Sequence, residues 1–120
     1  MEINYQFLRE YCLQMAGAST SYPFGEGVLV FKVANKMFAL IDEGQDPLRM
    51  NLKCDPEDAQ ALRAQYHAIQ PGYHMNKKHW NSLLIDGSLP DSLVVELINH
   101  SYELVLNKLK KSDREKLSRR

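Results

Sequence analysis

The sequence predicts one domain of the α+β class, and three observations lead to this prediction. Amphipathic helical patterns run over residues 3–16 and 90–109. Between them lie four short runs with strand character, at 28–33, 37–41, 48–53 and 80–85. The length of 120 residues is a common size for one domain with one hydrophobic core. We therefore expect a single domain over residues 1–120.

The N-terminal segment predicts a helix that ends before a glycine. Its apolar residues recur at helical spacing and form one stripe toward the core: Leu8, Tyr11, Cys12 and Met15. Gly17 supplies a helix stop. Residues 19–27 are rich in serine, proline and glycine, so we expect them to form a connecting loop.

The runs at 28–33 and 37–41 predict a β-hairpin, because both are apolar and the turn-forming stretch Ala34-Asn35-Lys36 separates them. In the run at 48–53 apolar and polar residues alternate strictly. This pattern turns Leu48, Met50 and Leu52 toward the core and Arg49, Asn51 and Lys53 toward solvent. We therefore expect one sheet face to be solvated and basic.

The second half of the chain carries clear helix-start signals. Asp55-Pro56-Glu57-Asp58 combines an N-cap acid, an early proline and acids that complement the helix dipole, which predicts a helix to about Tyr66. The turn Asp86-Gly87 closes the strand at 80–85. The helix at 90–109 has one apolar face that we expect to cover the sheet, made of Val94, Leu97, Ile98, Leu104 and Val105.

The charge is unevenly distributed along a chain whose total is zero. Residues 108–120 hold seven basic and two acidic residues, a net charge of +5, which leaves −5 for the rest. A capping-box pattern from Ser112 to Glu115 predicts that this tail forms a last short helix. A solvated basic tail explains the charge, and a nucleic-acid-binding arm is the alternative.

Composition and motifs argue against several classes of protein. There is no secretory leader pattern and no apolar run of about 18 residues, so we expect a cytoplasmic protein without a membrane span. Cys12 and Cys54 have neither disulfide nor zinc-finger spacing, which suits free thiols in a reducing compartment. Nucleophile-elbow, P-loop and dinucleotide fingerprints are missing, and the five-residue spacing of His74 and His79 does not suit a metal site. We expect no enzyme activity, no cofactor and no metal.

Three stretches together resemble the bacterial MmcQ/YjbR family. They are Pro71-Gly72-Tyr73-His74-Met75-Asn76-Lys77-Lys78-His79-Trp80, Ile85-Asp86-Gly87-Ser88-Leu89-Pro90-Asp91 and Ser101-Tyr102. The resemblance implies a CyaY-like α+β fold, an antiparallel sheet with the N- and C-terminal helices packed on one face. Members of this family are described as DNA-binding on the strength of a double-wing arrangement, and the resemblance carries no catalytic residues with it.

The densest polar cluster is His74, Asn76, Lys77, Lys78 and His79, beside Trp80. The lysines suit phosphate contacts, Asn76 suits a phosphate or a base edge, and an exposed indole suits base stacking. The structural alternative is that Trp80 packs in the core while Asn76 and His79 hold the loop by bonding its backbone.

Nucleic-acid binding is the leading specific function that the sequence suggests. The predicted contact residues combine the basic sheet face with this loop: Lys32, Arg49, Lys53, Asn76, Lys77, Lys78 and His79. Because the net charge is zero, we expect binding to DNA to be weak and salt-sensitive.

The alternative function is a protein-interaction or small-ligand module. Its recognition surface is formed by the loops Tyr22-Pro23-Phe24 and Pro71 to His79. One continuous basic stripe favours DNA, whereas basic residues scattered among Glu26, Asp42, Glu43 and Asp46 disfavour it. In either case we expect a monomer.

Overall fold

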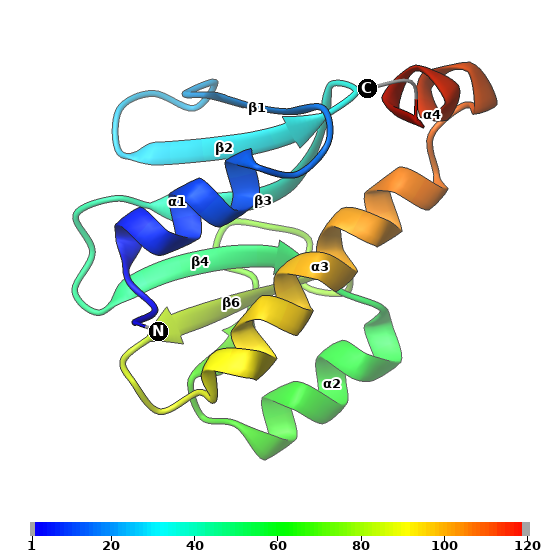
Figure 1. The fold of residues 1–120 in the computed structure, drawn as a ribbon. Helices are drawn as coiled ribbons and strands as arrows, with labels where there is room; N and C mark the ends of the chain where they lie inside the picture. Colours follow the sequence, from blue (N-terminus) through cyan, green and yellow to red (C-terminus); the bar gives the residue numbers. More distant parts are fainter. Residues whose placement is uncertain (1, 119–120) are drawn as a thin grey trace.

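The computed structural model describes residues 2–118, and a six-stranded antiparallel sheet forms its centre in the order β1-β2-β3-β4-β6-β5. The strands are β1 (Ala18–Ser21), β2 (Val28–Val33), β3 (Lys36–Asp42), β4 (Leu48–Lys53), β5 (Ile69–Pro71) and β6 (Trp80–Ile85). The helices are α1 (Tyr5–Leu13), α2 (Pro56–Gln65), α3 (Asp91–Asn107) and α4 (Lys111–Ser118). The predicted α+β class is confirmed, and α1 and α3 lie on one face of the sheet (Figure 1).

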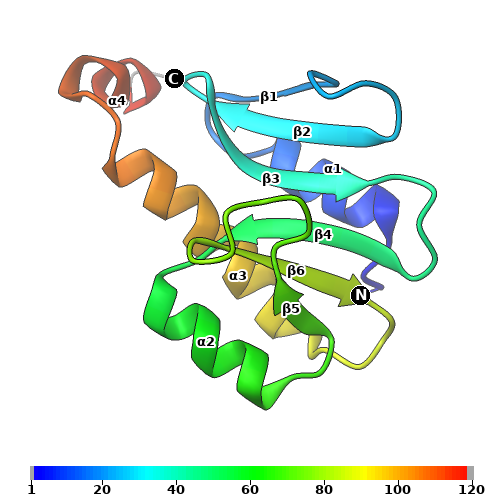
Figure 2. The same cartoon turned by 180° about the vertical axis from the view of Figure 1, so that it is seen from behind.

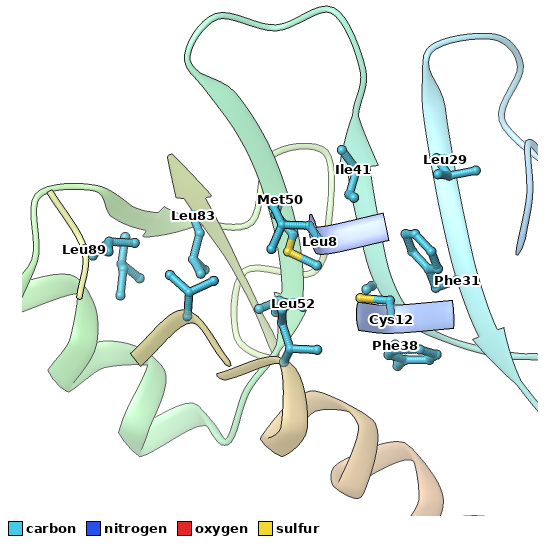
Figure 3. Packing of buried hydrophobic residues seen from close by; sticks show 14 of the residues in the cluster. Leu8, Cys12, Leu29, Phe31, Phe38, Ile41, Met50, Leu52, Leu83 and Leu89 are labelled. Atoms are coloured by element: carbon cyan, nitrogen blue, oxygen red, sulfur yellow. The ribbon is translucent and has the colours of Figure 1, made fainter. Parts of the chain in front are cut away.

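The main core lies between the sheet and these two helices. Figure 3 shows side chains from both layers meeting there, with Leu8 and Cys12 of α1 among residues of β2, β3, β4 and β6. Leu8 and Cys12 are fully buried, as the predicted stripe requires, whereas Tyr11 and Met15 are half-buried. The helix itself is shorter than predicted. It starts after Asn4, whose side chain accepts a hydrogen bond from the Phe7 amide at 2.8 Å.

A buried hydroxyl joins α3 to two strands. The pairing of β3 with β4 stops at Ala39 opposite Leu52. Beyond that point, the Lys53 amide donates to Ser101 Oγ at 2.9 Å, and Ser101 Oγ donates to the Phe38 carbonyl at 2.5 Å. The serine hydroxyl of α3 therefore bridges the two strands where their direct hydrogen bonds end.

The neighbour of this serine fastens α3 to the N-terminal part of the chain. The Tyr102 hydroxyl donates to the Ala16 carbonyl at 2.6 Å, and the Tyr102 ring meets Phe38 edge-on at 5.3 Å between centroids. The pair Ser101-Tyr102, one of the three stretches behind the family resemblance, thus holds the layers together.

The other face of the sheet is not the solvated basic surface that the alternation predicted. The loop between β5 and β6 lies across it (Figure 2), and a second cluster of Val30, Leu40 and Trp80 packs there with Met75. Asn51 is only 2% exposed, and Arg49 and Lys53 are half-buried. The pattern of one strand cannot show that a distant loop covers its polar side, and this is why the expectation was wrong.

Two further boundaries differ from the sequence predictions. The segment predicted as a loop over 19–27 contributes the edge strand β1, which pairs with β2 from Ala18 opposite Val33 to Ser21 opposite Val30. The tail does form a helix, but α4 begins at Lys111, so Ser112 lies inside the helix instead of capping it.

Helix α4 packs against the rest of the fold. Leu117 contacts the main core, and a Cβ on Gly17, whose φ is +74°, would lie 2.2 Å from Leu117 Cδ2. The side chains of the last tail residues, 118–120, lie outside the described part of the chain. In residues 2–118, no helix is long and apolar enough to cross a membrane.

Candidate functional site

A pocket of about 650 Å³ opens on the sheet face opposite α1 and α3. We call it the loop pocket. It is lined by Phe24, Glu26, Gly27, Val28, Leu40, Asp42, Glu43, Gln45, Arg49, Asn51, Tyr73, His74 and Met75. These residues come from the β1–β2 loop, the β3–β4 loop, the sheet and the β5–β6 loop. Both loops of the predicted recognition surface therefore contribute walls to one concave site.

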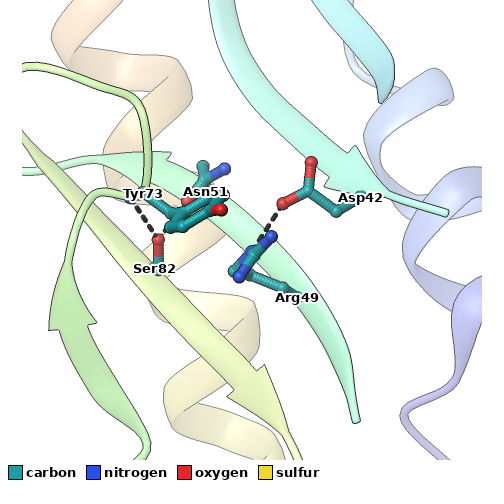
Figure 4. A network of polar contacts seen from close by, with 5 residues as sticks. All are labelled: Asp42, Arg49, Asn51, Tyr73 and Ser82. Atoms are coloured by element: carbon teal, nitrogen blue, oxygen red, sulfur yellow. Dashed lines mark hydrogen bonds and ion pairs between the residues drawn. The ribbon is translucent and has the colours of Figure 1, made fainter. Parts of the chain in front are cut away.

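A network of polar and aromatic contacts in the loop pocket is built around Arg49. Its Nε lies 2.5 Å from Asp42 Oδ2, and its guanidinium carbon lies 3.9 Å from the centroid of the Tyr73 ring (Figure 4). The side chains of Arg49 and Asp42 are only 19% and 13% exposed. Asp42 and Arg49 are cross-strand partners of β3 and β4, so the pairing of the sheet fixes this ion pair.

The sheet also positions Tyr73. The Tyr73 amide donates to Ser82 Oγ at 2.8 Å (Figure 4). The Ser82 hydroxyl donates in turn to Asn51 Oδ1. Asn51 and Ser82 are buried and face each other on β4 and β6. These two hydrogen bonds fix the start of the β5–β6 loop against strands β4 and β6.

Two tyrosine hydroxyls donate hydrogen bonds to the carboxylate of Glu43, which lines the pocket. The Tyr22 hydroxyl lies 3.0 Å from both carboxylate oxygens of Glu43, and the Tyr5 hydroxyl donates to Glu43 Oε2. Burial, together with the hydrogen bond to Glu43, raises the pKa of Tyr5 to about 12. The hydrogen bond to Glu43 also raises the pKa of Tyr22. Both phenols therefore stay protonated near neutral pH and donate their hydrogen bonds to Glu43.

The residues of the polar cluster mainly hold their own loop. Asn76 Oδ1 accepts from the amides of Lys78 at 2.9 Å and His79 at 3.3 Å, and Lys77 Nζ donates to the Gly72 carbonyl at 3.0 Å. Trp80 is buried in the second cluster. For Asn76 and Trp80 the structural alternative is confirmed. The His79 backbone carbonyl accepts from the Cys54 amide at 2.7 Å, and Lys78 is exposed.

Helix α2 supplies a contact that the sequence did not suggest. Arg63 Nε donates to Asn81 Oδ1 at 2.6 Å, and its guanidinium also donates to the carbonyls of Trp80, at 3.1 Å, and Lys77. A basic residue in the last turn of a helix usually complements the helix dipole. The sequence around Arg63 therefore does not indicate that its side chain binds the β5–β6 loop and β6.

The predicted basic residues do not form one stripe. Arg49 lies among the acids of the loop pocket. At the opposite strand ends, Lys36, Lys53 and Lys108 line a separate hollow of about 220 Å³ with Val105 and Leu109. We call these three lysines the lysine corner. The pKa of Lys53 is lowered, first by burial and then by the ammonium groups of Lys108 and Lys36. Lys32, on β2, is half-buried.

Metal ligation and thiol chemistry concern the histidines, the acidic residues and the two cysteines. In the part of the chain that it describes, no group of three or more histidine, cysteine or acidic residues could hold a metal ion. Burial raises the pKa of Cys12 to about 12, and burial with nearby carboxylates raises that of Cys54 to about 11. Both cysteines are free and buried.

Comparison with known proteins gives a consistent match. The model of the YjbR family matches residues 13–104. The uncharacterized protein YjbR of Escherichia coli (strain K12) is 36% identical over 110 residues, which cover 92% of this chain and 93% of that protein. The uncharacterized protein YyaQ of Bacillus subtilis (strain 168) is 36% identical over 76 residues, 63% of each chain.

Two solved structures share the fold. The crystal structure of the Deinococcus radiodurans protein DR2400, described as a DUF419 domain, superposes with a TM-score of 0.89 at 42% identity and covers 94% of this chain and 86% of that one. The crystal structure of a Pseudomonas syringae protein has a TM-score of 0.73 at 28% identity, with 85% and 98% covered.

Proposed function

The chain belongs to the YjbR family, and from that premise we propose that it is a non-catalytic binding module whose ligand occupies the loop pocket. The observation that carries this proposal is the convergence of two loops, far apart in the sequence, over a pocket with a fixed Arg49–Tyr73 contact. Its volume of about 650 Å³ lies within the range of small-ligand sites.

The chemistry of the pocket supports binding more than reaction. Asp42 pairs with Arg49, and Glu43 accepts from two tyrosines, so contacts within the protein hold both carboxylates in place. Neither cysteine lines this pocket. The polar groups of Asp42, Glu43 and Arg49 are held in positions that can orient a ligand. An apolar patch of Val28, Leu40 and Met75 lies beside them in the pocket.

The test is an amide NMR titration of the whole chain with a library of small fragments. We expect chemical-shift changes that cluster on the loops around Phe24 and Tyr73 and that weaken in Tyr73→Ala. Lys36→Ala, at the far end of the sheet, is the control and keeps wild-type binding. Shift changes that cluster elsewhere, or no binding by any fragment, would refute the proposal.

DNA binding is the second candidate function, and the lysine corner favours it. None of its three ammonium groups forms an ion pair with a carboxylate in residues 2–118. Such unpaired, crowded positive charge suits phosphate. The exposed Lys78 lies in the β5–β6 loop, next to His79, whose carbonyl accepts from the Cys54 amide just beyond the end of β4. Lys78 therefore adds positive charge at the same end of the sheet as the lysine corner.

Anisotropy titration of labelled double- and single-stranded DNA tests this candidate. We expect weak binding at low salt that fades at physiological salt. Lys36→Ala/Lys108→Ala should reduce the slope of log K against log salt by about 2, since each lost phosphate contact contributes about 0.9. Lys77→Ala/Lys78→Ala measures the share of the loop. If DNA does not bind even at low salt, this candidate is wrong.

We also propose that the module is a cytoplasmic monomer. The free, buried thiols of Cys12 and Cys54 support a reducing compartment. Light scattering coupled to size exclusion tests the monomer, and a mass near twice the 13.8 kDa of the chain would contradict it.

A further inference from the structure

We propose that the loop pocket selects a cation, a protonated amine or a guanidinium group carried on an apolar or aromatic stem. This inference rests on the ligand-binding function proposed for the same pocket and adds the chemical class of the ligand. It depends on three features of the pocket: its charge, its aromatic rim and the state of its arginine.

The charge of the lining is acidic. The carboxylates of Glu26, Asp42 and Glu43 line the pocket with one guanidinium, that of Arg49. Glu26 is exposed and forms no ion pair with a basic side chain in residues 2–118. Glu43 is half-buried and also has no such ion pair there, because its contacts are hydrogen bonds from the neutral hydroxyls of Tyr5 and Tyr22. Acidic groups therefore outnumber the permanent positive charge among the lining residues, and Glu26 and Glu43 carry the excess on the β1–β2 and β3–β4 loops.

Arg49 is a poor anchor for an anion. Its Nε is held at 2.5 Å from Asp42, and one face of its guanidinium is covered by the Tyr73 ring at 3.9 Å. An incoming carboxylate or phosphate would meet a guanidinium whose charge Asp42 already offsets, in a pocket that also holds the carboxylates of Glu26 and Glu43. The ion pair thus weakens the attraction of Arg49 for anions and leaves the surplus negative charge of the pocket to act on a cation.

The rim supplies apolar and aromatic contact. Phe24 is 61% exposed, two residues before Glu26, so a large ring and a carboxylate lie on the same short loop. A cation over an aromatic face is attracted by the ring quadrupole, and the apolar floor of Val28, Leu40 and Met75 accepts the stem. The stacking of Arg49 on Tyr73 already shows this type of contact within the pocket.

The experiment compares three probes with one stem and three charges: 3-phenylpropylammonium, 3-phenylpropan-1-ol and 3-phenylpropanoate, each titrated by amide NMR at neutral pH. We expect the ammonium to bind about tenfold tighter than the alcohol, a ratio equal to about 1.4 kcal/mol, and the carboxylate to bind weakest. Glu26→Gln should reduce the ratio toward one without changing the affinity of the alcohol. Glu103→Gln, on the exposed side of α3, should leave the ratio unchanged.

The outcomes separate the two proposals. Equal affinities, or tightest binding by the carboxylate, overturn the cation inference while the ligand-binding function stands. If fragments bind in the pocket but none of these three probes does, the inference fails alone. If no fragment and no probe binds, both fail. Acetyl-arginine amide as a fourth probe tells the source of the cation, because tighter binding than the simple amine favours a protein side chain over a free amine.

Discussion

Replacing Ser101 by alanine should destabilise the fold strongly, although it removes a single oxygen atom. The serine is fully buried, and its hydroxyl both accepts from the Lys53 amide and donates to the Phe38 carbonyl. Each intramolecular hydrogen bond contributes about 1–1.5 kcal/mol, and an unsatisfied buried group costs about 1–3 kcal/mol. The better helix propensity of alanine offsets a few tenths of a kcal/mol. We expect a net loss of about 2–3 kcal/mol.

Urea unfolding followed by the fluorescence of the buried Trp80 measures this loss. For an m-value of about 1–1.5 kcal/mol/M, the midpoint should fall by roughly 2 M. Ser92→Ala is the matched control, since Ser92 lies exposed on the same helix, and it should stay within about 0.5 kcal/mol of wild type. A similarly small effect in Ser101→Ala would show that the hydroxyl does not bridge the strands.

Three further changes test other parts of the fold. Gly17→Ala should loosen α4 and speed its proteolysis, because the new Cβ would clash with Leu117. The control Gly25→Ala has a similar positive φ but open space around the new Cβ, so it should show only the backbone strain of about 1–2 kcal/mol. Equal rates of proteolysis in the two variants would argue against docking of α4 at Gly17. Burial raises the pKa of the Cys12 thiol from its usual value of 9 to about 12 in the folded state, so the free energy of unfolding should be full below pH 9 and fall by about 1.4 kcal/mol per pH unit toward pH 12. Cys12→Ala should lower the stability at pH 7 but show a shallower alkaline decline of the urea midpoint. An unchanged decline in this variant would contradict the prediction. Asn76→Ala should leave two loop amides without their acceptor, cost about 1 kcal/mol and speed amide exchange across residues 72–80; unchanged exchange there would refute the role of Asn76.

Local patterns predicted those elements whose signals are local. The hairpin turn is an example, since Ala34 and Asn35 both adopt positive φ, as a two-residue hairpin turn requires. The start of α2 is another, with the Asp55 side chain accepting from the Glu57 amide at 3.1 Å. The edge strand β1 was missed because its Ala-Ser-Thr-Ser sequence has neither apolar alternation nor strand propensity beyond one threonine.

The sequence predicted only part of the candidate site. Its two loops were identified, but Arg49 was grouped with Lys53 on the basis of alternation alone. Alternation gives the face of a side chain and says nothing of its neighbours, and the pairing of Arg49 with Asp42 depends on the register between β3 and β4. The stretches behind the family resemblance describe the scaffold: a Cβ on Gly72 would lie 2.8 Å from Trp80 Cβ, so this glycine permits the loop to close over the tryptophan.

The two outermost strands determine what the edges of the sheet offer to a second copy of the chain. An exposed strand edge is a template for pairing with another chain, and natural proteins shorten or interrupt such edges. Here β1 has four residues and β5 has three, the last of them Pro71, which has no amide hydrogen to donate. Neither edge offers a second copy a long ladder of free backbone groups. Short edges of this kind disfavour edge-to-edge aggregation, and they leave the side-chain surfaces as the larger area for recognition by a partner.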